Sequence, residues 1–303
     1  MPSKENLIEK ILKLKKEKNA IILAHNYQIM DVQRVADFTG DSLQLAREAA
    51  EIDASLIVFC GVKFMAETAK LLNKNTKVLL SNKNAGCPMA DMINAKQLRN
   101  FKSEHKNPYV VCYVNSSVEV KAESDITCTS GNAIKVINSI PSDKTILFVP
   151  DQNLGTYSAQ QTGRKIIVWK GFCNVHHYNI TLEDVKRVRK EYPDYTLLVH
   201  PECKPEVFNQ ADFVASTKGM ADFAAKNDKL IIGTEIGLYY QLKDKYPDKK
   251  MIPLSNKSIC INMKKTTLED VYNTLLNEDN EITIDENIAD NAKKTIVKML
   301  EVS

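Results

Sequence analysis

The sequence lacks the features that mark several common classes of protein. It has no GxGxxG or GxxxxGK[ST] segment, so the commonest nucleotide-binding signatures are absent. It has no apolar run long enough for a signal peptide or a membrane span, and the stretch 1–19 is rich in Lys and Glu. Linkers rich in Pro, Ser or Gly and low-complexity tracts are also absent. We therefore expect a cytoplasmic protein.

The sequence also has little excess charge of either sign. The net charge is +3 at pH 7, and Lys and Arg are spread along the chain rather than grouped. Because basic patches carry most binding to nucleic acids and anionic membranes, we expect neither kind of partner. The hydrophobic content of 44% and charged content of 26% are typical of a globular protein with a large core. Length alone would suggest about two domains.

Cysteine pairs with CxxC spacing are missing, although the chain has seven cysteines. An odd number without an export signal argues against a disulfide framework and favours metal binding or catalysis. Cys60, Cys112 and Cys128 lie within apolar runs, where a cysteine is usually a small buried hydrophobic residue.

Short apolar runs alternate with amphipathic stretches along the whole chain. The runs, which predict buried strands, are 20–24, 56–59, 78–80, 109–112, 146–149, 166–169, 196–199 and 230–232. The amphipathic stretches, which predict helices, include 64–72, 181–191 and 267–276. Such alternation predicts the α/β class, with parallel sheets covered by helices on both faces as αβα sandwiches.

Similar residues recur at nearly constant spacing, which indicates a triplicated unit. Three polar residues end the first strand of each unit, and 88 and then 87 residues separate them: His25, Tyr113 and His200. Later positions of the repeat carry Tyr27, Asn115 and Glu202, then Asp37, Asp125 and Asp212, then Ser42, Ser130 and Thr217, and finally Cys87, Cys173 and Cys260. A repeat of roughly 90 residues predicts three pseudo-threefold-related units, 1–105, 106–191 and 192–303, in place of two domains.

The repeated polar residues lie where α/β proteins bind their ligands. Ligands of open sheets bind beyond the carboxyl ends of the strands, and residues at such ends suit proton transfer and hydrogen bonding. Ser42, Ser130 and Thr217 come directly before the predicted helices 43–50, 131–137 and 218–225. They either cap these helices or, together with the helix N-termini, bind anionic groups of a substrate.

Cys87, Cys173 and Cys260 occupy matched loop positions of the three units. Three thiolates that met near a pseudo-threefold axis would repel one another, and a metal would resolve the repulsion. Three ligands leave one coordination position open. In a zinc site that position would hold water or substrate, and in a [4Fe–4S] cluster it would let one iron bind substrate oxygens as a Lewis acid. All-thiolate ligation without CxxC favours the cluster, and zinc stays open.

Segments along nearly the whole chain resemble the quinolinate synthase family. They are LAHNYQ at Leu23, GDSLQLAR at Gly40, FCGVKFMAETAK at Phe59, AGCPMADM at Ala85, YVNSS at Tyr113, TSGNA at Thr129, PDQNLG at Pro150, HPEC at His200 and STKGM at Ser216. The resemblance implies three αβα units around a [4Fe–4S] cluster held by Cys87, Cys173 and Cys260. It also implies condensation of iminosuccinate (iminoaspartate) with dihydroxyacetone phosphate to quinolinate, with release of phosphate and two waters, in NAD biosynthesis.

The same resemblance implies roles for individual residues. The substrate-binding positions are His25, Ser42, Tyr113, Asn115, Ser130, His200, Glu202 and Thr217, and Tyr27 matches an active-site tyrosine. We assign proton transfer to His25, Tyr27 and Glu202. A functional partner that makes iminosuccinate from aspartate is also implied.

Three other functions stay open at this stage. The cluster could serve a redox or oxygen sensor, or the same three cysteines could hold the zinc of a hydrolase. Cys203 could act as a nucleophile with His200, although no third orienting group is evident. The many acid–base residues argue against a sensor, which would not need them.

Overall fold

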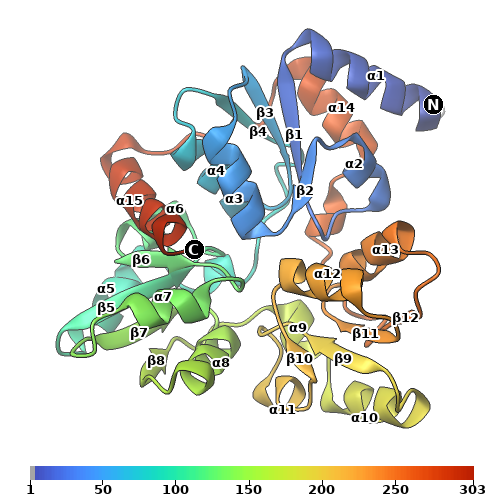
Figure 1. Ribbon diagram of the computed structural model, residues 1–303. Coiled ribbons are helices and arrows are strands. Elements are labelled where there is room, and N and C mark those ends of the chain that lie inside the picture. Colours follow the sequence, from blue (N-terminus) through green and yellow to red (C-terminus); the bar gives the residue numbers. More distant parts are fainter. Residues whose placement is uncertain (1–3) are drawn as a thin grey trace.

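The computed structural model describes residues 4–303, which form three units around a common centre (Figure 1). Each unit is built on a four-stranded sheet in which all neighbouring strands are parallel. The three sheets share one strand order, β2-β1-β3-β4, β6-β5-β7-β8 and β10-β9-β11-β12. The predicted α/β class with three similar units is therefore confirmed. No helix in this range is both long and apolar enough to cross a membrane.

The elements follow the repeat. The first unit contains α1 (Lys4–Glu17), β1 (Ala20–His25), α2 (Met30–Val35), β2 (Phe38–Gly40), α3 (Ser42–Glu51), β3 (Leu56–Cys60), α4 (Lys63–Leu72), β4 (Lys77–Leu80) and the 3₁₀ turn η1 (Ala90–Met92). The second contains α5 (Ala95–Ser103), β5 (Pro108–Tyr113), α6 (Val118–Ala122), β6 (Ile126–Cys128), α7 (Ala133–Ser139), β7 (Thr145–Val149), α8 (Gln152–Thr162), β8 (Ile166–Val168) and α9 (Asn174–Tyr178). The rest are α10 (Leu182–Glu191), β9 (Thr196–Val199), α11 (Pro205–Phe208), β10 (Phe213–Val214), α12 (Thr217–Lys226), β11 (Leu230–Gly233), α13 (Ile236–Lys245), β12 (Met251–Pro253), η2 (Met263–Lys265), α14 (Leu268–Asn277) and α15 (Glu286–Val302).

All eight apolar runs predicted as strands are strands, and the three predicted amphipathic helices are α4, α10 and α14. The strands β2, β6, β10 and β12 were not predicted. Each is an outer strand of only two or three residues, too short to show a hydrophobic period.

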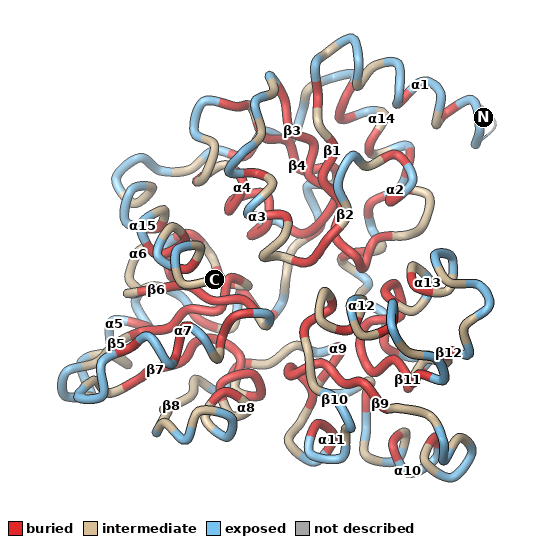
Figure 2. The backbone as a smooth tube through the Cα atoms, viewed as in Figure 1, coloured by how far each residue is buried: buried red, intermediate tan, exposed pale blue. Residues whose placement is uncertain are grey.

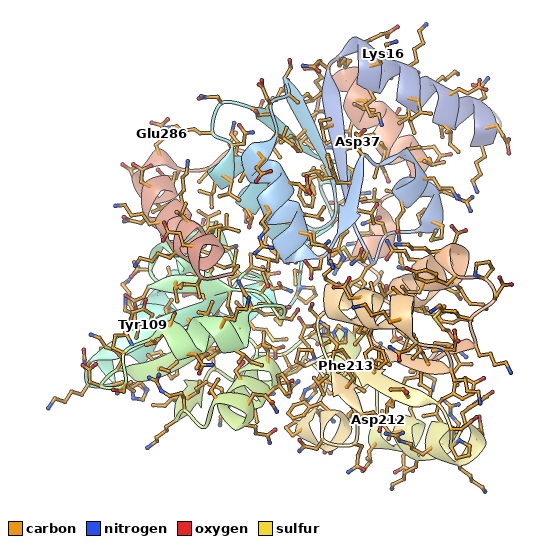
Figure 3. The ribbon with its side chains drawn as sticks, viewed as in Figure 1. Lys16, Asp37, Tyr109, Asp212, Phe213 and Glu286 are labelled. Carbon is orange, nitrogen blue, oxygen red and sulfur yellow. The ribbon has the colours of Figure 1, made fainter. Side chains whose placement is uncertain are left out.

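The repeated aspartate joins each first strand to its outer neighbour. Asp37 donates its N–H to the carbonyl of Ile22 at 2.9 Å, and its Oδ2 accepts the N–H of Ile22 at 2.8 Å. Asp125 pairs with Val110 in the same way, and Asp212 with Leu197, with side-chain bonds of 2.7 Å in both units. The aspartate thus satisfies a strand N–H just before the outer strand begins. Figure 3 labels Asp37 and Asp212 in their units.

A helix on the C-terminal side of each of Cys87, Cys173 and Cys260 packs on the next sheet along the ring: α5, α10 and α14. Leu98 of α5 packs with Val110 of β5, and Val188 of α10 packs with Leu197 of β9. Val271 of α14 returns to the first unit and packs with Ile22 of β1. All three helices begin with a capping box, which fixes where each one starts. The three units therefore form a closed ring rather than a row.

The hydrophobic core runs through the ring. One cluster of buried residues includes side chains from the inner faces of all three sheets, such as Leu23, Val111 and Leu198. Figure 2 shows the buried strands of the three units converging on the centre. The C-terminal helix α15 packs against α6 and β6 of the second unit and against α4 of the first. Because helices cross between units, the predicted boundaries 1–105, 106–191 and 192–303 stay a prediction.

Candidate functional site

A cavity of about 330 Å³ lies where the three units meet. Its walls include every residue predicted for the site: His25, Tyr27, Ser42, Cys87, Tyr113, Asn115, Ser130, Cys173, His200, Glu202, Thr217 and Cys260. These residues lie together because the parallel strands of each sheet have their carboxyl ends at the same edge, and this edge of all three sheets faces the centre.

Two of the three first strands lead into a histidine whose tautomer is fixed. The Nδ1 atom of His25 accepts the N–H of Tyr27 at 3.1 Å, and Nδ1 of His200 accepts the N–H of Glu202 at 3.3 Å. Each neutral ring must therefore carry its proton on Nε2, and His200 Nε2 lies 3.2 Å from the hydroxyl of Ser130. Burial lowers the pKa of each histidine to about 3. Both rings are thus neutral Nε2–H donors at pH 7.

A chain of hydrogen bonds crosses the cavity wall between two tyrosines. Tyr113 Oη donates to Glu202 Oε1 at 2.5 Å, and Glu202 Oε2 lies 2.6 Å from Nδ1 of His176. His176 Nε2 lies 2.9 Å from Thr234 Oγ1, which lies 2.6 Å from Oη of Tyr27. This chain of hydrogen bonds links residues of all three units, so a proton transfer at one end changes the hydrogen bonding at the other.

Charge within this chain is concentrated on Glu202. Burial acts to raise the pKa of Glu202, but its electrostatic interactions with His176 and His200 and its hydrogen bonds with His176 and Tyr113 lower it to about 2. The pKa values of Tyr27 and Tyr113 lie well above the usual range because of burial and the nearby Glu202. A carboxylate base therefore stands between two neutral phenol donors.

The structure corrects one interpretation of the repeated hydroxyls. Asp41, not Ser42, caps α3, and its Oδ1 accepts the N–H groups of Leu43 and Gln44. Ser216, not Thr217, caps α12. Asn132 stands at the cap position of α7, two residues after Ser130. The N-capping interpretation is wrong at all three positions.

The cavity walls offer neutral hydrogen-bond donors in place of cationic side chains. Among the described residues, neither Lys nor Arg lines the cavity. Donors come instead from Ser42 and Thr217 in the first turns of α3 and α12, and from the Nε2–H groups of the histidines. The Oδ1 atom of Asn115 is buried without a hydrogen-bond partner within the described residues, which indicates that a ligand group completes the site.

Three thiols form another part of the wall. Burial raises the pKa of Cys87 to about 12 and also raises those of Cys173 and Cys260, and the thiols oppose one another's ionisation. Each sulfur also faces peptide N–H groups of the turn that follows, such as that of Ala90 for Cys87 and that of Met263 for Cys260. Three half-buried soft donors with N–H support, and no fourth cysteine beside them in the cavity wall, fit a [4Fe–4S] cluster with one iron left open.

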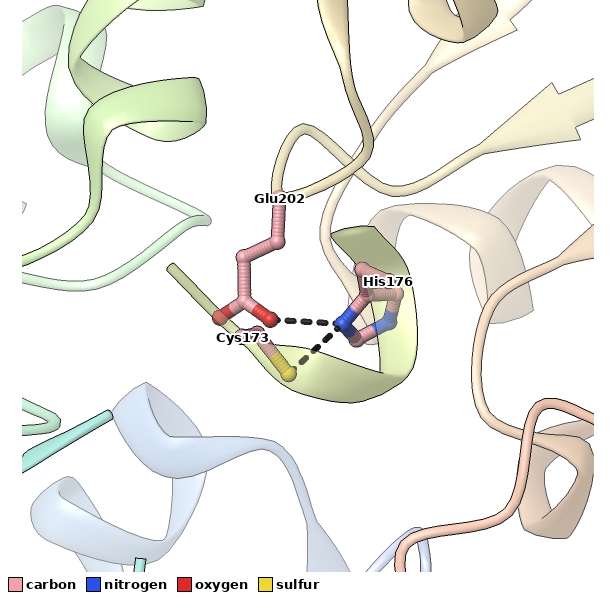
Figure 4. A group of neighbouring side chains, drawn as sticks. All are labelled: Cys173, His176 and Glu202. Carbon is pink, nitrogen blue, oxygen red and sulfur yellow. Dashed lines mark hydrogen bonds and ion pairs between the residues drawn. The ribbon is translucent and has the colours of Figure 1, made fainter. Parts of the chain in front are cut away.

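His176 is the main site residue that the repeat did not reveal. Its Nδ1 lies 3.3 Å from Sγ of Cys173, and a ligand atom from each of Cys173, His176 and Glu202 lies within 4.8 Å of the others (Figure 4). The positions three residues after the other two cysteines carry Ala90 and Met263. The comparison of units therefore gave no signal for a histidine.

The remaining cysteines are structural. Cys60, Cys112 and Cys128 are fully buried in β3, β5 and β6, as predicted. Cys203 is fully buried in an apolar cluster of the third unit, and burial raises its pKa well above the usual range. A buried thiol of this kind is a poor nucleophile, which argues against the pairing of Cys203 with His200.

Comparison with known proteins matches nearly the whole chain to one family. A family model described as Quinolinate synthetase A protein matches residues 9–301. A protein of Alkaliphilus metalliredigens named Quinolinate synthase is 55% identical over 300 residues, which cover 98% of each chain. Proteins of the same name from Dehalococcoides mccartyi (strain CBDB1) and Caldicellulosiruptor saccharolyticus are 52% and 50% identical, and each match covers 99% of both chains.

Proposed function

This chain belongs to the quinolinate synthase family and is an enzyme, and from this premise we propose that it condenses iminosuccinate (iminoaspartate) with dihydroxyacetone phosphate. The products are quinolinate, inorganic phosphate and two waters, and the reaction belongs to de novo NAD biosynthesis. One observation carries the proposal: the twelve residues predicted for this chemistry come from three units of the chain and line a single cavity.

Cys87, Cys173 and Cys260 are the residues that would hold a [4Fe–4S] cluster in this enzyme. When bound, the cluster supplies a Lewis acid at the iron without a cysteine ligand, which suits the loss of hydroxide in two dehydrations. The thiols support the proposal because they lie in one wall and influence one another's pKa.

The hydroxyls of Ser42, Ser130 and Thr217 bind the two carboxylates and the phosphate. None of the three is occupied as a helix cap, and Ser42 and Thr217 stand in the first turns of ten-residue helices, whose positive dipole ends favour anions. The Nε2–H of His200 supports Ser130 from behind. Neutral donors of this kind hold an anion without the ion pair that a buried lysine or arginine would form.

Proton transfer is the task of His25, Tyr27 and Glu202. Converting the keto sugar phosphate to its aldo form and forming an enamine both require a base to remove a proton and an acid to return it. Glu202 is ionised and accepts protons at its carboxylate, whereas Tyr27 Oη and His25 Nε2 carry protons to donate. Tyr113 and His200 orient the substrate, and Asn115 offers its unpartnered Oδ1 to a donor group of it.

The proposal includes a cytoplasmic location and a functional link to an enzyme that produces iminosuccinate from aspartate. All seven cysteines are free thiols, a state that the reducing cytoplasm maintains.

Anaerobic purification tests the proposal directly. We expect iron and sulfide in the wild-type protein, broad absorption near roughly 400 nm, and formation of quinolinate from the two substrates. Cys87→Ser, Cys173→Ser and Cys260→Ser should each lose the cluster and the activity, whereas Cys203→Ser keeps both. Wild-type protein that is free of iron would overturn the cluster, and iron-loaded protein that makes no quinolinate would overturn the reaction.

One observation favours zinc as a second candidate. Cys173, His176 and Glu202 together offer sulfur, nitrogen and oxygen donors that are typical of catalytic zinc sites. These donors already bond to one another, however, and the site uses only one of the three cavity thiols. Zinc without the 400 nm absorption would favour a hydrolase.

A further inference from the structure

Two buried carboxylates bind the backbone N–H groups of two of the three cavity cysteines. Glu235 is 0% exposed, and its Oε1 accepts the N–H of Cys260 at 3.0 Å. Asp151 is also 0% exposed, and its Oδ2 accepts the N–H of Cys173 at 3.2 Å. Asp151 and Glu235 stand at the same place in their units, two residues after the ends of β7 and β11. The arrangement is therefore a feature of the repeat and not a chance contact.

The rest of each carboxylate is bound to the rigid part of its unit. Asp151 Oδ1 accepts the N–H of Leu154 at 2.7 Å, in the first turn of α8. Glu235 Oε2 accepts the N–H of Gly237 at 2.7 Å, in the first turn of α13. Each carboxylate thus connects a cysteine loop to the start of a helix.

Lys264 gives Glu235 a third connection. Its Nζ lies 3.0 Å from Oε1 and 3.1 Å from Oε2 of Glu235, and it also donates to the carbonyl of Tyr27. The charge of the buried carboxylate is therefore neutralised in place. Through Lys264 the Cys260 loop is also connected to the backbone of Tyr27.

Glycines allow the close approach that both anchors need. A Cβ on Gly237 would lie 2.7 Å from Glu235 Oε2 and 2.8 Å from Lys264 Nζ. A Cβ on Gly171, two residues before Cys173, would lie 2.5 Å from the carbonyl oxygen of Pro150. Both distances are too short for real atoms, so each site is packed around its anchor.

The first unit lacks the anchor. The position two residues after the end of β3 is Val62, whose side chain accepts no hydrogen bond. The pseudo-threefold symmetry is therefore broken at these positions, which carry carboxylates in the second and third units and a valine in the first.

We infer that Asp151 and Glu235 are positioning residues that fix the backbone of two of the three cluster ligands, Cys173 and Cys260. The inference rests on the proposed function because it requires a cluster. A peptide N–H held by a rigid carboxylate limits rotation about the cysteine backbone and keeps the sulfur directed at the metal. Partners of metal ligands typically contribute about 10–100-fold to metal affinity.

The test compares matched carboxylate-to-amide changes in the anaerobic, iron-loaded protein. Asp151→Asn and Glu235→Gln keep side-chain shape but remove one acceptor, and Asp125→Asn makes the same change at a carboxylate that binds a strand N–H elsewhere. We expect iron loss to EDTA about 10-fold faster or more in the first two variants, and a changed electron paramagnetic resonance spectrum of the reduced cluster. Asp125→Asn should match the wild type in both measurements.

A second variant covers the case in which Glu235→Gln is unstable because Lys264 is left unpaired. Glu235→Gln combined with Lys264→Met removes both charges and should restore the melting temperature of the iron-free protein, while iron loss stays fast. Iron loss and spectra equal to those of Asp125→Asn in all these variants would overturn the inference and leave the cluster standing. Wild-type protein without iron and sulfide would overturn the cluster and the inference together.

Discussion

The two ends of the three sheets differ in how well they keep the repeat. At the outer end, Asp37, Asp125 and Asp212 make the same two bonds to the first strand of their unit. At the inner end, the residue types at matched positions differ between units: His25, Tyr113 and His200, and then Tyr27, Asn115 and Glu202.

The difference follows from what each end must do. A strand N–H next to a short outer strand needs an acceptor in every unit, so one residue type serves all three. The substrates proposed for the cavity have no threefold symmetry, and three identical sets of groups could not supply a base, acids and anion donors together. The three thiols are the exception, and the proposed cluster accounts for this because it would bind three thiolates in equivalent positions.

Among the variants that test this difference between the two ends, we expect the largest fall in activity at Glu202. Glu202→Gln keeps the shape of the side chain but removes the one carboxylate in the series of hydrogen bonds that links Tyr113 to Tyr27. We expect kcat for quinolinate formation to fall by about 10²–10⁴-fold, with an unchanged circular dichroism spectrum. Asp212→Asn, the same kind of change at the outer end, is the control. A fall of less than tenfold in Glu202→Gln would argue against its role as the base.

The next largest effect is expected at the inner-end hydroxyls. Ser42→Ala, Ser130→Ala and Thr217→Ala each remove a donor to a charged group, a bond that contributes about 1.5–3 kcal/mol and hence roughly 10–100-fold in KM. Steady-state kinetics with each substrate varied in turn should show which anion each hydroxyl binds. Ser139→Ala, whose hydroxyl only bonds within α7, should leave KM unchanged. Unchanged KM in all three site variants would exclude the proposed anion sites.

The sequence allowed the inner end to be predicted in large part. Runs such as Ile146–Val149 are strongly apolar because both faces of a covered parallel sheet are buried, and such runs mark where strands end. Once the strand ends are known, parallel topology places the residues that follow them on one side. The matched positions of Cys87, Cys173 and Cys260 in the repeat then predicted that the three cysteines lie close together.

The residues that were missed are those without a matched partner in every unit. His176 has Ala90 and Met263 at its equivalent positions, and Asp151 and Glu235 have Val62. Pro150–Asp151 directly follows the apolar run 146–149, and Thr234–Glu235 follows the run 230–232 after one glycine. These two pairs were a signal for the anchors, present in two of the three units. The helix caps at Asp41 and Ser216 were missed because each stands beside another polar residue that could serve equally well.

Stability, not activity, should change at the outer end. Asp125→Ala leaves the N–H of Val110 without its side-chain acceptor, and an unsatisfied buried group costs about 1–3 kcal/mol. Urea unfolding of the iron-free protein should show this loss, while kcat of the iron-loaded protein stays within twofold of the wild type. A large fall in kcat at full iron content would show that the two ends are coupled, contrary to the comparison.

The smallest effect concerns pH at Asp212, the outer-end aspartate that pairs with an arginine. Burial acts to raise its pKa, but hydrogen bonds from Arg189 and from the N–H of Leu197 lower it below the usual value. A carboxyl whose pKa is lower in the folded chain stabilises the fold above its unfolded pKa of about 4. That stabilisation is lost as pH falls through the lower, folded value. Since the carboxylate is 44% exposed, we expect Asp212→Asn to be less stable than wild type by about 1 kcal/mol or less at pH 7, and by clearly less near pH 3. Urea midpoints at the two pH values measure the change, and an equal difference at both would mean that Asp212 acts through its backbone bond and shape rather than through its charge.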